Sequence, residues 1–221
     1  INETINKKSI IVTGCNVNTI NISLSNKRFE KILSEFDIIH PDGIGIYLAS
    51  RLLYGQKGFS SRFTGSDFYS HLINSAIENN WSFYFFGDEE KTLKLITKNL
   101  PKIKIAGFCN GFNYDNNDLI VKINNSNPDI LIVGLGSPKQ EQWIIENKRN
   151  INTKVIIAVG DGIKVFAGTK KRGPKFIQKI GLEWFVRFLY EPKRLWKRYF
   201  IGIPLFIFRV IKFKLLNTKA G

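Results

Sequence analysis

Apolar residues along the first three quarters of the chain follow two alternating patterns. Six short runs are rich in β-branched and aromatic residues and have the length of buried strands. Most of the stretches between them repeat apolar residues at helical spacing instead. The predicted strands are residues 9–13, 36–40, 81–86, 102–106, 129–133 and 154–159.

Helical spacing is clearest in three of the intervening segments. We expect Ser66 to cap the second and Asp88 to cap the third, while residues 113–127 predict a further, polar helix. Strands separated by single helices favour parallel pairing with right-handed crossovers, hence a Rossmann-like α/β fold with helices on both faces. The apolar positions are Phe29, Ile32, Leu33 and Phe36; Phe68, Leu72, Ile73 and Ile77; and Leu93, Ile96 and Leu100.

After Gly173 the pattern changes to aromatic and basic residues that share helical stretches. Such a mixture is typical of a segment that lies in the headgroup region of a membrane. The longest uncharged apolar run, 199–208, is about half of what a spanning helix needs, and Pro204 is expected to interrupt it. We therefore predict an α/β domain over 1–173 and a helical, membrane-associating appendage over 174–221. The alternative is a core helix with snorkelling lysines.

The net charge of +15 is concentrated in the same region. Residues 164–221 contain 15 Lys and Arg against 2 Asp and Glu, which leaves the rest of the chain with a surplus of only 2. This asymmetry indicates a local surface for a polyanion, either nucleic acid or anionic lipid. No RNA-recognition motif accompanies the charge, so we expect a membrane surface and no nucleic acid.

The cysteines and the opening residues bear on the compartment. Cys15 and Cys109 lie far apart and have no metal-binding spacing, so they are expected to be ordinary buried thiols, as suits a reducing cytosol. Residues 1–9 are polar and lack the apolar region of a signal peptide. We expect a cytoplasmic protein, peripheral on the inner face of the cell membrane.

Polar and glycine-rich clusters follow four of the predicted strands. Ligands gather at the carboxyl ends of parallel strands, glycines allow close approach to the backbone, and helix N-termini present N–H groups to phosphate. Four clusters at one edge predict a nucleotide-sized ligand. They are His40-Pro41-Asp42-Gly43, Phe86-Gly87-Asp88, the run from Gly134 to Glu141, and Gly160-Asp161-Gly162.

Two of these clusters also have purely structural interpretations. Ser137, Pro138 and Gln140 have the spacing of a capping box, which needs no substrate. Asp42 is the best candidate for a general base because a carboxylate on a strand-end turn can accept a proton, but it could instead cap a helix over 44–53. His40 is a weaker candidate, and His71 fits a structural position in mid-helix better.

Several familiar catalytic patterns are missing from the sequence. There is no Ser-His-Asp order, zinc-ligand spacing or Walker loop. The Asp-x-Asp pattern of many metal-dependent glycosyltransferases is also missing, so we expect no metal ligands and no cofactor.

Five motifs together resemble the WecG/TagA/CpsF glycosyltransferase family, over about residues 10–208. They are Pro-Asp-Gly-Ile-Gly at 41–45, Arg-Phe-Thr-Gly-Ser-Asp at 62–67, Gly-Leu-Gly-Ser-Pro-Lys-Gln-Glu at 134–141, Gly-Leu-Glu-Trp at 181–184 and Glu-Pro-Lys-Arg-Leu-Trp-Lys-Arg-Tyr at 191–199.

The resemblance implies transfer from a UDP-sugar to an undecaprenyl-diphosphate-linked sugar, with inversion and without a required metal. In TagA-like members the donor is UDP-N-acetylmannosamine and the acceptor a lipid-linked N-acetylglucosamine. A homo-oligomer is compatible with this reading. The family's catalytic aspartate matches Asp42. The expected substrate-binding residues are Asn16, Arg62, Gly87, Gly134, Gly136, Lys139, Gln140, Glu141, Arg187, Arg194 and Arg198, the last sharing its match with Lys197.

The sequence departs from the family pattern at three places. Gly14 stands where a threonine is common, which leaves Asn16 as the matching residue; Ile163-Lys164-Val165 replaces a segment with an acidic centre; and Arg172-Gly173-Pro174 replaces Arg-Ala-Pro. The first two bear on the identity of the donor. Two other classes of function stay open at this point: a non-catalytic nucleotide-binding protein with a basic membrane anchor, and an RNA-binding α/β domain.

Overall fold

The computed structural model describes residues 9–218, and the expectations for residues 1–8 and 219–221 lie outside this range. The chain forms two compact units. We call the first the sheet unit; it comprises the residues up to Gly14, Lys31–His40 and Ser66–Thr169. The second, the helical unit, comprises Cys15–Glu30, Pro41–Gly65 and the chain from Lys170 onward. The C-terminal segment thus shares a compact unit with two earlier segments.

A six-stranded parallel sheet forms the centre of the fold, in the order β2-β1-β6-β5-β3-β4. All six predicted strands are confirmed, with boundaries moved by one to three residues. The strands are β1 (Ile10–Cys15), β2 (Ile38–Pro41), β3 (Ser82–Gly87), β4 (Lys104–Cys109), β5 (Ile130–Gly134) and β6 (Val155–Ala158).

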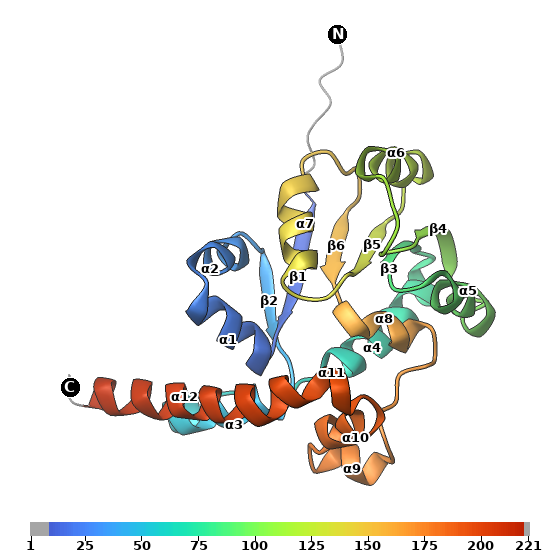
Figure 1. Ribbon diagram of the computed structural model, residues 1–221. Helices are drawn as coiled ribbons and strands as arrows, with labels where there is room; N and C mark the ends of the chain where they lie inside the picture. The colour runs from blue at the N-terminus through green and yellow to red at the C-terminus, as the bar shows by residue number, and fades with distance from the viewer. Residues whose placement is uncertain (1–8, 219–221) are drawn as a thin grey trace. The chain divides into compact units, whose positions relative to one another are not determined.

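Alternate residues of the central strands fill two separate cores. In β3, Phe83 and Phe85 belong to one core, while Tyr84 and Phe86 belong to the other. The first core is covered by α4 (Gly65–Asn79), α5 (Glu90–Asn99) and α8 (Ile163–Phe166), and the second by α6 (Asn116–Ser126) and α7 (Lys139–Asn147) (Figure 1). Each fully buried aromatic ring contributes roughly 1.5–3 kcal/mol. The predicted Rossmann-like layering, with helices on both faces, is confirmed.

The predicted helix caps of this unit are partly wrong. Ser66 lies inside α4, which already begins at Gly65. The N-cap position of α5 is Glu89; Asp88 precedes it with φ of 56°, and its carboxylate accepts the Glu89 N–H at 2.7 Å. An aspartate tolerates this left-handed conformation because its short side chain bonds locally. The predicted polar helix is confirmed as α6.

The helical unit contains most of the remaining elements. They are α1 (Val17–Ser25), α3 (Ile44–Tyr54), η1 (Gly55–Lys57), α9 (Lys175–Lys179), α10 (Glu183–Tyr190), α11 (Pro192–Trp196), the π-helical turn η3 (Lys197–Ile201) and α12 (Gly202–Thr218). The helix α2 (Lys27–Ser34) runs from this unit into the sheet unit, and the short η2 (Gly160–Gly162) belongs to the sheet unit.

The elements α11, η3 and α12 form one uninterrupted helical run over residues 192–218, so the expected break at Pro204 is wrong. Pro204 lies in the first turn of α12, directly after the π turn. There the hydrogen-bond ladder changes spacing, and a missing N–H costs little. At 1.5 Å per residue the run is about 40 Å long. Within residues 9–218, no helix has the combination of length and hydropathy needed to cross a bilayer.

Candidate active site

Asp42 follows the last residue of β2 and is held by the backbone on both sides. Its amide donates to the Cys15 carbonyl at 2.8 Å, and its Oδ1 accepts the Gly65 N–H at 2.9 Å. The N-cap position of α3 is Gly43, and no side chain caps this helix. The alternative role of Asp42 as the cap of α3 is therefore wrong. Its half-buried carboxylate is instead fixed against the start of α4.

The charge of Asp42 acts on the thiol beside it. Burial, and secondly the Asp42 carboxylate, raise the pKa of Cys15 to about 11. At neutral pH the thiol is thus protonated and a poor nucleophile. Burial also raises the pKa of Cys109. Both cysteines are free and partly buried, so neither is a candidate for the chemistry.

Asn16 and Arg198 lie 182 positions apart in sequence and form a direct hydrogen bond. Asn16 is the N-cap of α1, and its Oδ1 accepts the N–H groups of Asn18 and Thr19 at 3.0 and 3.2 Å. The same oxygen accepts Arg198 Nη2 at 3.0 Å. The cap of α1 therefore also fixes a guanidinium group from the C-terminal segment.

Three arginines of the C-terminal segment influence one another electrostatically. Burial lowers the pKa of Arg198; the positive charges of Arg187 and Arg194 lower it further, while Tyr199 and Asp42 raise it. Arg194 also pairs with Glu191. A guanidinium stays protonated in proteins, so this group concentrates positive charge within reach of the Asp42 carboxylate. Such a cluster suits a phosphate-bearing ligand.

Arg62 braces the segment that precedes this arginine cluster. Its Nη2 donates to the Gln178 carbonyl at 2.7 Å, and its Nη1 lies 4.0 Å from the Glu183 carboxylate. Arg172 reaches the same carboxylate at 3.2 Å. The substrate-binding role of Arg62 stays a prediction, and the observed contacts give it a positioning role. The sequence reasoning missed Glu183, although it lies in one of the five motifs.

The expected capping box at the start of α7 is wrong. The helix begins at Lys139, which is exposed, and no side chain caps it. Gln140 instead accepts the backbone N–H groups of Gly136 at 3.1 Å and Gly160 at 2.8 Å through Oε1. It thereby joins the turns after two neighbouring strands, β5 and β6. No periodicity in the sequence signals this contact.

The next residue extends the network into the sheet. Glu141 is fully buried, and its Oε1 accepts Gln140 Nε2 at 2.9 Å and the Thr13 hydroxyl at 3.1 Å. Within residues 9–218, its Oε2 has no hydrogen-bond partner. A charge so deep in the protein requires partners, and Thr13 is the partner that sequence reasoning missed. A buried hydroxyl in an otherwise apolar strand was the available signal.

The glycines after the strands serve two different purposes. A Cβ on Gly87 would lie 2.6 Å from the backbone of Gly134, so these residues allow two strand ends to approach closely. Gly136 has φ of 80° and open space where a Cβ would be. Its N–H, however, already donates to Gln140. Binding of a diphosphate by this amide, which the glycine pattern suggests, would require Gln140 to move away.

The description of the matching family model is "Glycosyl transferase WecG/TagA/CpsF family", and the model covers residues 1–220. The chain belongs to this family. It is therefore a glycosyltransferase, which decides against a non-catalytic nucleotide-binding protein and an RNA-binding domain.

Relatives in the WecG/TagA/CpsF family share one described activity. The chain is 33% identical to an N-acetylglucosaminyldiphosphoundecaprenol N-acetyl-beta-D-mannosaminyltransferase of Bacillus spizizenii, over 97% of this chain and 83% of the relative. A Bacillus subtilis enzyme of the same name is 32% identical, over 90% and 80%. A Staphylococcus aureus enzyme of that name is 26% identical, over 96% and 84%.

The three departures from the pattern of the WecG/TagA/CpsF family have local explanations. A Cβ on Gly14 would lie 2.8 Å from the ring of His40, so the glycine makes room for the imidazole. Lys164 pairs with Asp161 at 3.2 Å. Gly173 has φ of 72°, and a Cβ there would lie 2.9 Å from Val186, which favours glycine over alanine.

Proposed function

We propose that this glycosyltransferase transfers N-acetylmannosamine from its UDP derivative to the N-acetylglucosamine of a diphosphoundecaprenol-linked acceptor. The observation that carries the proposal is the similarity to two Bacillus enzymes named for this acceptor and sugar, at 32–33% identity over at least 90% of the chain. The pathway is the synthesis of a cell-surface polysaccharide or teichoic acid.

The proposed reaction is a single displacement at the anomeric carbon of the donor. A hydroxyl of the acceptor sugar attacks this carbon as the bond to the UDP oxygen breaks, and one displacement inverts the configuration. Asp42 accepts the hydroxyl proton as general base. Its contact with the Gly65 N–H supports this role because it holds the carboxylate in one orientation.

The negative charge that develops on the leaving UDP requires cations. Arg187, Arg194 and Arg198 are assigned to this task, because they lie close enough to lower the pKa of Arg198 and because arginine binds phosphate through paired N–H groups. The hydrogen bond from Arg198 to Asn16 supplies part of their positioning. The proposal includes no metal cofactor.

The lipid acceptor implies reaction at a membrane surface. The helical unit supports this part of the proposal, because exposed aromatic residues such as Phe176, Phe200 and Phe208 lie among the basic residues of the C-terminal segment. We assign the protein a peripheral position on the inner leaflet.

The test is a transfer assay with purified protein and a diphosphate-linked N-acetylglucosamine acceptor on a prenyl chain. A panel of UDP-sugars should give turnover with UDP-N-acetylmannosamine at least about 10-fold above UDP-N-acetylglucosamine and UDP-glucose. Nuclear magnetic resonance of the product should show the inverted linkage. Preference for another UDP-sugar would reject the donor assignment, and turnover without the lipid diphosphate would reject the acceptor assignment.

A further inference from the structure

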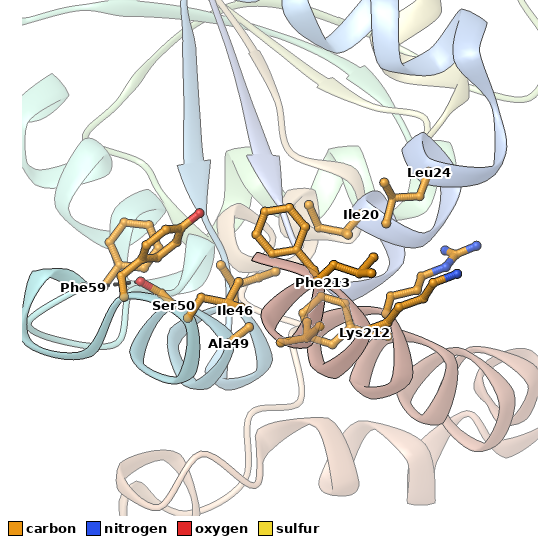
Figure 2. A pocket seen from close by; sticks show the side chains of 14 residues that line it. Ile20, Leu24, Ile46, Ala49, Ser50, Phe59, Lys212 and Phe213 are labelled. Atoms are coloured by element: carbon orange, nitrogen blue, oxygen red, sulfur yellow. Dashed lines mark hydrogen bonds between the residues drawn. The ribbon is translucent and has the colours of Figure 1, made fainter. Parts of the chain in front are cut away.

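A groove with mostly apolar walls lies within the helical unit, between α1, α3 and α12 (Figure 2). Its volume is about 600 Å³, within the range of pockets that hold small organic ligands. Its walls include Ile20 and Leu24 of α1, Ile46 and Ala49 of α3, and Phe206 and Phe213 of α12. Leu24 is 56% exposed and Phe213 50%, so the groove leaves large apolar side chains accessible.

Each of the three helices carries its wall residues on one face. Ile20 and Leu24 are four positions apart, Ile46 and Ala49 three apart, and Phe206 and Phe213 seven apart. These spacings bring side chains to the same side of a helix. Figure 2 shows the α1 and α3 residues on opposite sides, with the ring of Phe213 between them.

The two helices α1 and α12 run side by side in the same direction. Asn16, before α1, contacts Arg198; Asn21 contacts Gly202 at 2.6 Å; and Arg209 donates to Asn21 at 3.0 Å and to Ser25 at 2.8 Å. These polar contacts close the side of the groove between the helices. They also fix which end of each helix is near Arg198.

The polar end of this arrangement is the candidate active site. The helix α1 begins directly after Asn16, α3 begins two residues after Asp42, and the run that contains α12 passes through Arg198. Helix N-termini carry partial positive charge, and that of α3 has no side-chain cap. An anion is favoured at this end, and a hydrocarbon is favoured along the groove.

The distances match one continuous amphiphilic ligand. Ile46 lies four residues beyond Asp42 and Tyr54, the last α3 residue of the wall, twelve, or about 6 to 18 Å along the helix axis. Phe206 lies eight residues beyond Arg198, or about 12 Å. A diphosphate at the polar end therefore leaves its attached chain at the mouth of the apolar groove.

We propose that the groove binds the isoprene units nearest to the diphosphate of the acceptor lipid. The inference rests on the proposed function, since the relatives are named for a diphosphoundecaprenol acceptor. A volume of about 600 Å³ holds several isoprene units, and the rest of the eleven-unit chain remains in the bilayer. Binding of the chain here fixes the depth of the acceptor sugar relative to Asp42.

Calorimetric titration of the full chain with soluble probes tests the groove without turnover. Farnesyl diphosphate should bind at least about 10-fold more tightly than inorganic diphosphate, because the farnesyl chain leaves water. Ala49→Phe fills the groove and should remove this advantage while changing the Kd of inorganic diphosphate less than about twofold. Leu48→Phe, at an exposed position of α3 outside the groove, is the matched control and should behave as the parent.

A second variant guards against misfolding of the first. Leu24→Ser alters the exposed rim, so it should retain the melting temperature and still weaken farnesyl diphosphate about 3-fold or more. Equal Kd values for the two probes in the parent protein would overturn the proposal. So would unchanged farnesyl diphosphate binding in both variants, or weakened binding only to vesicles of neutral phospholipid, which would assign the groove to membrane acyl chains.

Kinetics with two acceptors separate this proposal from the proposed function. Ala49→Phe should raise the KM of a farnesyl-linked acceptor about 10-fold and leave the KM and kcat of a butyl-linked acceptor unchanged. If no lipid-linked acceptor supports transfer but the farnesyl diphosphate advantage persists and depends on Ala49, the proposed acceptor fails and the groove stands. An equal KM change for both acceptors would reject the groove.

Discussion

A single carboxylate holds the chemical part of the proposal. Asp42 lies on the turn after β2, with its amide bonded to Cys15 and its Oδ1 bonded to Gly65. Asparagine keeps the oxygen that accepts the Gly65 N–H, but it cannot take a proton. The substitution therefore separates the positioning of this side chain from its basicity.

We predict that Asp42→Asn lowers kcat by about 100-fold or more, the usual contribution of a general base. Binding of UDP and the melting temperature should stay close to those of the parent. Asp115→Asn, at the cap of α6, is the control and should keep full activity. Near-normal turnover in Asp42→Asn would remove Asp42 from the catalytic role.

Another aspartate makes stability depend on pH. Asp129 accepts bonds from Lys154 Nζ and from the N–H and hydroxyl of Ser82. The hydrogen bond from Lys154 is the largest cause and Ser82 the next, and together they lower the pKa of Asp129 to about 2. Its carboxylate therefore stabilises the fold above the unfolded-state pKa of about 3.9, and this contribution is lost as pH falls towards 2.

We predict that Asp129→Asn lowers the free energy of unfolding by about 1 kcal/mol at pH 7, a value reduced for solvent screening because the side chain is 25% exposed. The difference from the parent should shrink between pH 4 and pH 2. Urea unfolding at several pH values measures it. A difference that is constant over this range would show that the charge of Asp129 is not the cause.

At the scale of elements, the turn between β5 and α7 depends on one side chain. Gln140 is buried and accepts two backbone N–H groups, from Gly136 and Gly160, while it donates to Glu141. Its removal leaves buried donors without partners, which costs more than the loss of one exposed hydrogen bond.

We predict that Gln140→Ala lowers the free energy of unfolding by roughly 2–3 kcal/mol. Gln142→Ala, which loses only an exposed contact with Glu146, should cost less than about 0.5 kcal/mol. Denaturant unfolding compares them. Activity measured at a temperature where both variants are folded then tests the predicted substrate contact: full specific activity in Gln140→Ala would leave Gln140 a structural role only.

At the scale of the whole molecule, charge and exposed aromatic residues occur in the same segment. Residues 164–221 have a surplus of 13 positive charges. Phe200 is 66% exposed and Phe208 63%. Basic residues give salt-sensitive attraction to anionic lipid, at about 1 kcal/mol each near the surface, whereas aromatic insertion resists salt.

We predict that the double variant Phe200→Ser and Phe208→Ser binds vesicles with anionic lipid at least about 10-fold more weakly in high salt than the parent does. Its melting temperature should be unchanged, because both rings are exposed. Phe112, in the sheet unit, is 76% exposed, so Phe112→Ser is the matched control for a lost surface ring. Equal vesicle binding of all three proteins would reject insertion by the C-terminal segment. Sedimentation with vesicles measures it.

Local pattern was sufficient for the sheet and for the class of enzyme. Strands such as β3 and β5 are short apolar runs whose alternate residues face two cores, and that periodicity is a property of the strand itself. The motifs around Asp42 and Gln140 carried the family resemblance, which the family match confirms. The surplus of positive charge after residue 164 is likewise a matter of composition.

Contacts between distant residues were decided by the tertiary structure alone. The capping-box pattern at Gln140 is local and was wrong, because the neighbouring positions of β5 and β6 in the sheet bring Gly160 within 2.8 Å. The bond between Asn16 and Arg198 and the groove between α1, α3 and α12 depend on how helices pack, which periodicity within each helix does not specify. A sequence pattern determines which face of an element is apolar, and packing determines what that face meets.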